Sequence, residues 1–228
     1  MKLMNVEEFI SANNCKVLYH MSEKGSWPTI QKLGLLSTSA LLDECGVTGS
    51  KRFSLESELR IRKELIPHPL YGDIYLRDQD PMRDRPSDGI KLANLLTPGT
   101  TVQQWLEFLN GRTFFWVSKY EFLKMLCARL YKYKPHWVIT LDTRALLRAY
   151  SHVASVSDQN SGSLYSGKLR GLSTFVPLLM CPTKKNIMEL AIDDRVPDIE
   201  KFTLSVDECV GSWQNDQRIC KKVKHIWP

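Results

Sequence analysis

Apolar residues recur along this chain at helical spacing in some stretches and at strand-like spacing in others, so both kinds of element are predicted. Residues 5–12 (NVEEFISA) have a helical pattern, and Asn5 with Glu8 can form a capping box at its start. The apolar run KVLYHM predicts a strand that ends at His20. SEKGSWPTIQKLGLLST then predicts a turn and a helix that stops at Gly34. The chain therefore opens with a strand, a turn and a helix, with a histidine at the strand end.

Further elements follow through the middle of the chain. The charged pattern from Leu41 to Leu65 is helical, and Pro67 and Pro69 end it. The segment YGDIYLRDQDPM predicts a strand and a polar loop, and DRPSDG predicts a turn. Helices are predicted at TVQQWLEFL (101–109), KYEFLKMLCARLYKY and TRALLRAY, and strands at GRTFFWVS and HWVITLDT.

The last third of the chain contains a long segment without periodicity. The stretch from Ser155 to Ser173 is rich in Ser and Gly and is predicted to be a loop, and loops of this length in compact domains are often functional. Strands are predicted at STFVPLL, at NIMELAI and within VPDIEKFTLSVDECV, and the tail QRICKKVKHIWP is basic. No repeat or linker divides the chain, so we expect one domain over residues 1–228, of the mixed α/β (α+β) class.

Composition narrows the function classes without selecting one. The hydrophobic fraction of 43% suffices for a globular core, and the formal net charge is +6. This charge favours an anionic partner such as nucleic acid, a membrane surface or a phosphate-bearing cofactor, although basic residues that are spread out can also serve solubility alone.

Cysteine and histidine usage argues against a metal site, since the six cysteines form no CxxC pair and the histidines are scattered. The chain begins with acidic residues rather than the apolar run of a signal peptide, and no stretch is apolar enough to span a membrane. We therefore expect a cytoplasmic protein with free thiols.

His20 is the first candidate functional residue. A histidine at a strand end, before a turn and a helix, can donate or accept a hydrogen bond at the edge of a cleft. Backbone N–H groups near Gly25 and the helix start can bind a phosphate or an amide. The competing interpretation is a structural histidine bonded to a backbone carbonyl, which is the commoner outcome for a lone histidine.

Glu189 is the second candidate because it interrupts the apolar strand NIMELAI. Strict alternation places Met188, Leu190 and Ile192 on the core face, which leaves Glu189 on the opposite surface or in a cleft. The competing interpretation is an ordinary solvated glutamate.

A third candidate is the aromatic strand RTFFWVS, in which Phe114, Phe115 and Trp116 put large rings on both faces. Rings beside a cleft can stack on a nicotinamide or an adenine. Core packing is the competing interpretation for most of these rings.

Together these segments resemble the ADP-ribosyltransferase fold, and in particular the DarT-type nucleic-acid ADP-ribosyltransferases. LYHMSEKGSWPTIQKLGLLS is similar to that family's opening segment, in which a strand-end histidine precedes a turn and a helix ending in Gly-Leu-Leu. RTFFWVS resembles its aromatic second strand, and NIMELAIDDRVPDIEKF resembles its late strand with a central glutamate and a Val-Pro turn. The chain as a whole also resembles an uncharacterised bacterial family of unknown function.

The first resemblance implies a split mixed β-sheet with flanking helices, NAD as the substrate that supplies ADP-ribose, and no metal. It implies that His20 binds a ribose of NAD. Glu189 would bind the 2′-hydroxyl of the nicotinamide ribose and stabilise the cationic transition state, and Trp116 or Phe115 would pack on the nicotinamide. Further cofactor contacts are expected at Ser22, Gly25, Ser37 and Thr38.

The chain departs from the family pattern in two places. Ser118 and Lys119 stand where the family has an arginine soon after the aromatic strand, and we assign the catalytic arginine to Arg77, with Arg129 as a second choice. Residues 41–99 have no counterpart and are expected to be an insertion, which leaves the acceptor open.

The net charge and the resemblance both favour a nucleic-acid acceptor, a base in DNA or RNA. Lys168 and Arg170 of the long loop are its expected contacts, although a plain surface loop is equally compatible with the pattern. The resemblance also implies a toxin or phage-defence role with an inhibitor or antitoxin partner. The alternatives are a catalytically inactive binding module of the same fold and an NAD glycohydrolase.

Overall fold

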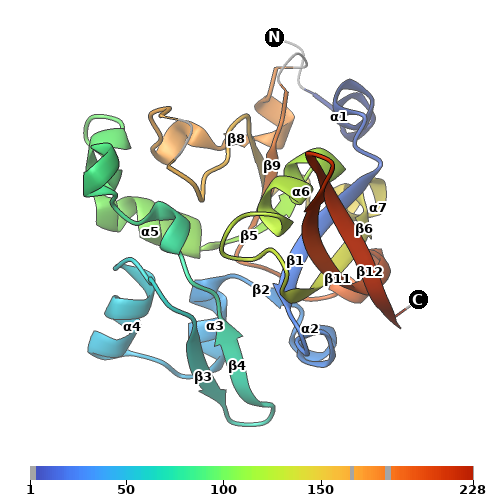
Figure 1. Ribbon diagram of the computed structural model, residues 1–228, viewed down its shortest axis with the longest axis horizontal. Coiled ribbons are helices and arrows are strands. Elements are labelled where there is room, and N and C mark those ends of the chain that lie inside the picture. The colour runs from blue at the N-terminus through green and yellow to red at the C-terminus, as the bar shows by residue number, and fades with distance from the viewer. Residues whose placement is uncertain (1–3, 165–166, 183–185, 228) are drawn as a thin grey trace.

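The computed structural model describes residues 4–164, 167–182 and 186–227. Its main feature is an eight-stranded antiparallel sheet with the order β12-β11-β6-β1-β5-β9-β7-β8 (Figure 1). Helices flank this sheet, so the predicted α+β class is confirmed, whereas the sheet is antiparallel in its described pairs rather than mixed. The strands are β1 (Val17–Glu23), β5 (Arg112–Trp116), β6 (Pro135–Asp142), β7 (Ala154–Ser157), β8 (Val176–Pro177), β9 (Glu189–Asp193), β11 (Thr203–Gln214) and β12 (Gln217–Trp227).

The sheet divides between β1 and β5. These two strands pair through Tyr19 and Trp116 alone among the described residues, whereas β1 pairs with β6 over its whole length. β12, β11, β6 and β1 therefore form one half of the sheet, and β5, β9, β7 and β8 form the other. Beyond the single pair the two halves separate, which leaves space between them.

Alternating residues of the central strands bury the two faces of the sheet against different helices. Leu18 and Ile139 face a core that also contains α1 (Val6–Asn13), α2 (Trp27–Leu33) and α7 (Thr143–Tyr150). Met21 and Val138 face α6 (Lys119–Leu126). α1 begins with the predicted capping box of Asn5 and Glu8.

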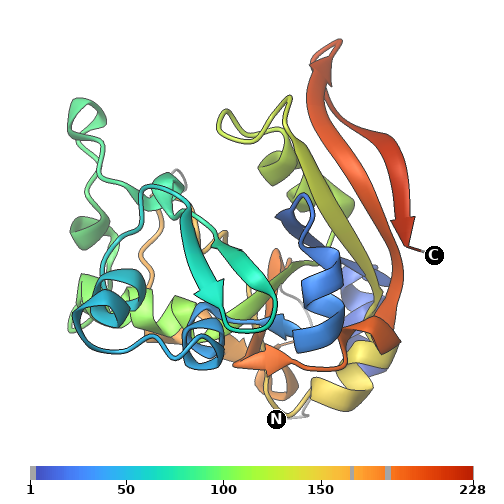
Figure 2. The same cartoon turned by 90° about the horizontal axis from the view of Figure 1, so that it is seen from below.

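An inserted lobe occupies most of residues 38–110 and lies on one side of the sheet (Figure 2). It has a small core of its own around Leu42, Leu55 and Ile66. Its elements are α3 (Thr38–Glu44), α4 (Gly49–Glu56), β3 (Glu64–His68), β4 (Gly72–Leu76), the 3-10 helices η1 (Asp80–Met82), η2 (Pro86–Asp88) and η3 (Leu92–Leu95), and α5 (Val102–Asn110).

Short elements complete the fold. β2 (Leu35–Leu36) pairs with β10 (Arg195–Val196), and the remaining 3-10 helices are η4 (Leu172–Thr174), η5 (Leu178–Met180) and η6 (Ile199–Phe202). α2 ends at Gly34 as predicted. A Cβ at Gly34 would lie 2.4 Å from the Cα of Pro197, and its φ of +83° favours glycine.

The structure corrects two predicted helices. The helix over 41–65 is wrong: α3 and α4 are separated by Gly46 at φ +63°, and β3 occupies the end of that range. KYEFLKMLCARLYKY is helical only to Leu126, because the chain then turns under β11, where the amide of Tyr133 donates to the carbonyl of Gly211.

Two corrections concern strands. The loop predicted from Ser155 begins inside β7, and its residues 165–166 lie outside the described chain. The basic tail is β12, an edge strand whose charged residues face solvent and therefore leave no apolar alternation in the sequence.

Candidate functional site

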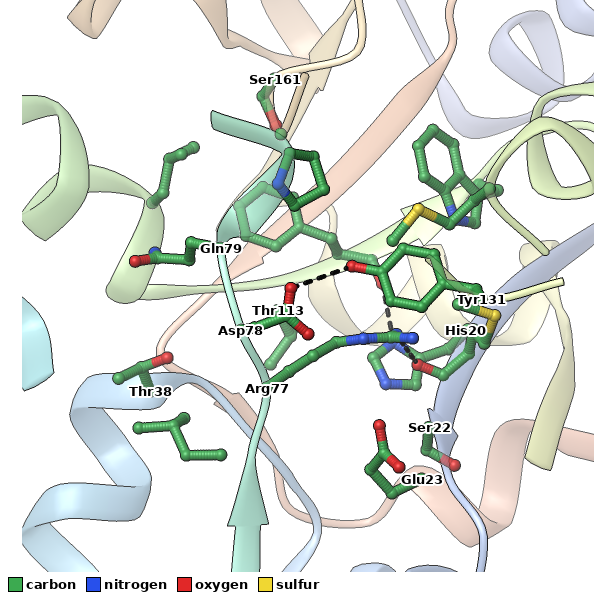
Figure 3. A pocket seen from close by; sticks show the side chains of 18 of the residues that line it. His20, Ser22, Glu23, Thr38, Arg77, Asp78, Gln79, Thr113, Tyr131 and Ser161 are labelled. Atoms are coloured by element: carbon green, nitrogen blue, oxygen red, sulfur yellow. Dashed lines mark hydrogen bonds between the residues drawn. The ribbon is translucent and has the colours of Figure 1, made fainter. Parts of the chain in front are cut away.

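A cavity of about 1060 Å³ lies where the two halves of the sheet separate (Figure 3). Its walls come from the end of β1, from β5 and from the segment 159–163, and the inserted lobe closes it through β4. His20, Glu189 and Arg77 all line this cavity. The fold thus brings together three residues that are far apart in the sequence.

His20 bridges the gap between the halves of the sheet. Its Nδ1 lies 2.9 Å from the carbonyl oxygen of Phe114, next to the single β1–β5 pair. Burial lowers the pKa of His20 to about 4, so the imidazole is neutral at pH 7. A carbonyl oxygen only accepts, so Nδ1 carries the proton and Nε2 is left as an acceptor. The hydrogen bond to a backbone carbonyl, which the competing interpretation predicts, is therefore present. It leaves Nε2 available to a ligand.

Glu189 is buried, with 4% of its surface exposed, because β9 has neighbours on both sides. The expectation of an open strand surface is therefore wrong, and the alternative of a cleft position is correct. Its Oε2 accepts a hydrogen bond of 3.0 Å from the amide of Ser161. Burial raises the pKa of Glu189 to about 7, although the bonds from Ser161 and the charge of Arg170 oppose that rise.

Arg77 reaches the cavity from the inserted lobe, directly after β4. Its Nη1 donates to the carbonyl of Met21 at 2.9 Å, and its guanidinium lies 4.7 Å from the ring centroid of Tyr131. Nε and Nη2 are buried and have no hydrogen-bond partner in the described part of the chain. A buried guanidinium with two free donors is suited to an anionic or carbonyl group of a ligand.

A network that the sequence analysis missed holds the segment after β4 against the helices of the inserted lobe. Arg60 is 7% exposed, and its guanidinium donates to the carbonyls of Arg77 and Leu55 and to the side chains of Thr38 and Asn110. The SLESELRIRKEL pattern is indistinguishable from a solvated helix, so nothing in the sequence singles out Arg60.

A second carboxylate, Glu121, also lines the cavity and was not identified from the sequence. It is 8% exposed, forms an ion pair of 2.8 Å with Lys124, and contributes to the raised pKa of Glu189. Its position at the start of α6 is typical of a helix-stabilising acid, so the sequence gives no sign of this location.

The four small residues expected to contact the cofactor all line the cavity. Ser22 donates its hydroxyl to the carbonyl of Trp137, Ser37 caps α3 through the amide of Ala40, and Thr38 accepts from Arg60. Their side chains therefore have structural partners. Gly25, at φ +92°, has open space on its Cβ side.

The two aromatic candidates differ in environment. Phe115 is 1% exposed and belongs to the main core, with its ring centroid 5.9 Å from that of His20. Trp116 is partly buried and lines the cavity, where β5 pairs it directly with Glu189. Trp116 is thus the better placed of the two to contact a ligand.

The expected acceptor contact at Arg170 does not agree with the structure. Arg170 is fully buried, and its guanidinium donates to the carbonyls of Ser161, Ser163 and Lys168 in its own loop. Its observed role is to shape the loop that holds Glu189. Lys168 is exposed and lines the cavity, as does Arg129.

Among the described residues, no group of three or more His, Cys, Asp or Glu side chains is placed to hold a metal ion. Within the same residues, every helix is too short or too polar to cross a membrane.

These features define a class: an α+β protein in which a split antiparallel sheet and an inserted lobe enclose a cavity with a neutral imidazole, a buried carboxylate and an arginine. A family model described as a family of unknown function (DUF7002) matches residues 16–203. The chain therefore belongs to this family. A search of curated proteins finds no match. The family match spans the three residues named above.

Proposed function

We propose that this protein cleaves the bond between nicotinamide and ribose in NAD and transfers the ADP-ribose to an acceptor. The observation that carries the proposal is the convergence of His20 and Glu189 on one cavity at the split of the sheet. The resemblance of the segments around both residues to the DarT-type ADP-ribosyltransferases supports the same chemistry.

In this proposal the C1′–N bond breaks and its electron pair goes to the pyridinium nitrogen, which leaves as neutral nicotinamide. The ribose becomes cationic, as in glycoside cleavage. The ionised Glu189, hydrogen-bonded to the 2′-hydroxyl, stabilises that cation, and burial makes the interaction stronger than it is in water. The acceptor then bonds to C1′ and gives up its proton.

His20 and Arg77 have binding roles in the proposal. The Nε2 of the neutral His20 accepts a hydrogen bond from a ribose hydroxyl. The free Nε and Nη2 donors of Arg77 bind an oxygen of the pyrophosphate, and Trp116 packs on the nicotinamide. Each role uses a donor, an acceptor or a ring that the described protein leaves available at the cavity.

The acceptor in this proposal is a base of DNA or RNA. The net charge of +6 and the resemblance favour it over water. An inhibitor or antitoxin that blocks the cavity is the expected partner in the cell.

The test is nicotinamide release from NAD by purified protein, with and without single-stranded nucleic acid. Glu189→Gln should lower the rate by at least about 100-fold, the scale on which a single transition-state interaction is lost. Glu58→Gln is the matched control, because Glu58 is exposed and lies in the inserted lobe away from the cavity. Circular dichroism and thermal unfolding establish that both variants are folded.

Three outcomes would contradict the proposal in different ways. Equal nicotinamide release by wild type and Glu189→Gln would remove Glu189 from the chemistry. Saturable binding of NAD that stays intact would identify a binding module. Free ADP-ribose as the product, with every nucleic acid unmodified, would identify a glycohydrolase.

A further inference from the structure

The positive charge of this chain is concentrated in two segments. Residues 117–135, which include α6 and the loop after it, carry five Lys or Arg residues against one Glu. Residues 213–227, which form the hairpin tip and β12, carry four against one Asp. Their combined excess of seven positive charges is larger than the +6 of the whole chain, so all other residues together have one excess negative charge.

The fold places the two segments side by side. The amide of Tyr133 donates to the carbonyl of Gly211 at 2.8 Å, and Nε1 of Trp213 donates to the carbonyl of Cys127 at 3.4 Å. Figure 2 shows the β11–β12 hairpin and the loop before β6 projecting in the same direction beyond the sheet. We call residues 117–135 and 213–227 together the basic rim.

Exposed aromatic rings stand among these charges. Tyr120, Tyr133 and Trp213 are 63%, 61% and 44% exposed. The guanidinium of Arg218 lies 4.7 Å from the ring centroid of Trp213, and the ammonium of Lys132 lies 5.2 Å from that of Tyr133. Exposed rings of this size beside cations offer stacking faces to flat, partly polar groups such as bases.

The basic rim is continuous with the cavity. Lys124, Arg129 and Arg218 belong to the rim and also line the cavity that contains His20 and Glu189. A polymer that lies along the rim therefore passes the mouth of the cavity, and one unit of it can enter.

We infer that the basic rim binds an unpaired polynucleotide strand. The cations neutralise successive phosphates, and the exposed rings stack on bases that a duplex would keep covered. An anionic membrane fits less well, because the residues around Trp213 at the hairpin tip are the polar Gln214, Asn215 and Gln217. The inference rests on the proposed function for the fate of the strand: a base unstacked at the rim becomes the acceptor.

The test is the anisotropy of a fluorescent single-stranded DNA oligonucleotide titrated with protein in the absence of NAD. A triple variant of the rim, Arg129→Ala with Lys132→Ala and Arg218→Ala, is compared with wild type. The matched control removes the same charge from exposed lysines elsewhere: Lys16→Ala, Lys32→Ala and Lys51→Ala.

The rim variant should bind at least tenfold more weakly at about 0.1 M salt, and the slope of log K against log salt should fall by about 2, for three lost phosphate contacts. The control variant should bind like wild type. Single-stranded RNA of the same sequence is a further arm, and binding of either strand at the rim supports the inference.

Equal weakening in both triple variants would show that only net charge matters and would overturn the inference. Tighter binding to the annealed duplex or to phosphatidylserine vesicles would overturn it as well. Nicotinamide release is measured separately on the same proteins. Wild-type protein that releases nicotinamide but binds no strand contradicts the rim alone, whereas wild-type protein that binds the strand but releases no nicotinamide contradicts the proposed function alone.

Discussion

Glu189 combines a buried position with an ionisable group, and this combination has consequences for activity. Because burial raises its pKa to about 7, the carboxyl is largely protonated below that pH. His20, whose pKa is lowered to about 4, stays neutral above pH 5 and adds no second titration. Because the proposed chemistry requires the ionised carboxylate, the pH dependence of the rate should follow the titration of Glu189.

We expect nicotinamide release at saturating NAD to rise about tenfold per pH unit below pH 7 and to level off above it. The measurement is the turnover rate between pH 5 and 9, with NAD binding measured in parallel. A rate that peaks near pH 5 and falls toward pH 8 would show that the protonated carboxyl, or another group, is the active form.

The same pKa shift lowers the stability of the folded protein above neutral pH. Between pH 4.5 and 7 the folded state holds the Glu189 proton and the unfolded state releases it, so the free energy of unfolding falls as pH rises through that window. The difference between about 7 and the ordinary 4.5 corresponds to about 3 kcal/mol.

Glu189→Gln should therefore unfold at higher denaturant than wild type at pH 8, by up to about 3 kcal/mol, and the gain should disappear near pH 4. Urea unfolding at both pH values measures it. Glu58→Gln serves again as the control and should match wild type throughout. If the stability difference between Glu189→Gln and wild type were the same at pH 8 and at pH 4, the result would show that burial does not raise the pKa of Glu189.

The sequence predicted which residues line the cavity better than it predicted how each one is placed there. The histidine and the carboxylate are visible as interruptions of apolar runs, and both line the cavity. Their predicted strand positions are wrong, because β1 continues past His20 to Glu23 and β9 begins at Glu189. Arg170 could not be placed correctly, because a loop without periodicity gives no sign of which basic residues point inward. Glu121 lies in the first turn of a helix and Arg60 in a charged segment with helical spacing, so neither position stands out in the sequence.

At the level of elements, Arg60 joins the parts of the inserted lobe to one another. Its buried guanidinium accounts for four contacts that join β4, α3, α4 and α5. Burial lowers the pKa of Arg60 to about 10, which still leaves it charged at neutral pH. Removal of the guanidinium leaves several buried acceptors unsatisfied.

Arg60→Ala should lower the free energy of unfolding by about 3 kcal/mol and weaken NAD binding, because the backbone of Arg77 loses a partner. Chemical unfolding and equilibrium dialysis with NAD are the measurements. Arg62→Ala, two residues away and exposed, is the control and should change neither. Equal effects of the two substitutions would contradict the structural role of Arg60.

Elements with caps and clear alternation were predictable, and those shaped by tertiary contacts were not. α1, α2 and β5 follow from the capping box, Gly34 and the aromatic strand. β12 was not predicted because an edge strand in solvent needs no apolar face. The helix predicted over 41–65 failed because helical spacing of charged residues does not reveal a break at Gly46.

At the scale of the whole molecule, a bound dinucleotide would touch both halves of the sheet and the inserted lobe. His20 lies on β1, Glu189 on β9 and Arg77 after β4. Ligand binding to the folded state alone raises stability by an amount set by its concentration and Kd.

NAD at 100 times its Kd should therefore stabilise the inactive Glu189→Gln protein by about 2.7 kcal/mol. Arg77→Ala in the same background should abolish most of this gain at equal NAD, whereas Arg83→Ala, at an exposed neighbour that forms an ion pair with Asp80, should retain it. Thermal unfolding with and without NAD measures both. An undiminished gain in the Arg77→Ala protein would exclude Arg77 from the NAD site.

The single backbone pair between Tyr19 and Trp116 has a mechanical consequence. Each half of the sheet is stiffened by longer ladders, whereas the backbone pairing across the seam consists, among the described residues, of one rung beside the hydrogen bond of His20. The angle between the halves is therefore set mainly by side-chain packing, because one core that contains Leu18 of β1 and Phe115 and Leu190 of the other half lies across the seam. Because His20 and Glu189 stand on opposite sides of it, a small rotation there alters their separation while both halves keep their internal geometry, and a molecule that grips both residues fixes the angle.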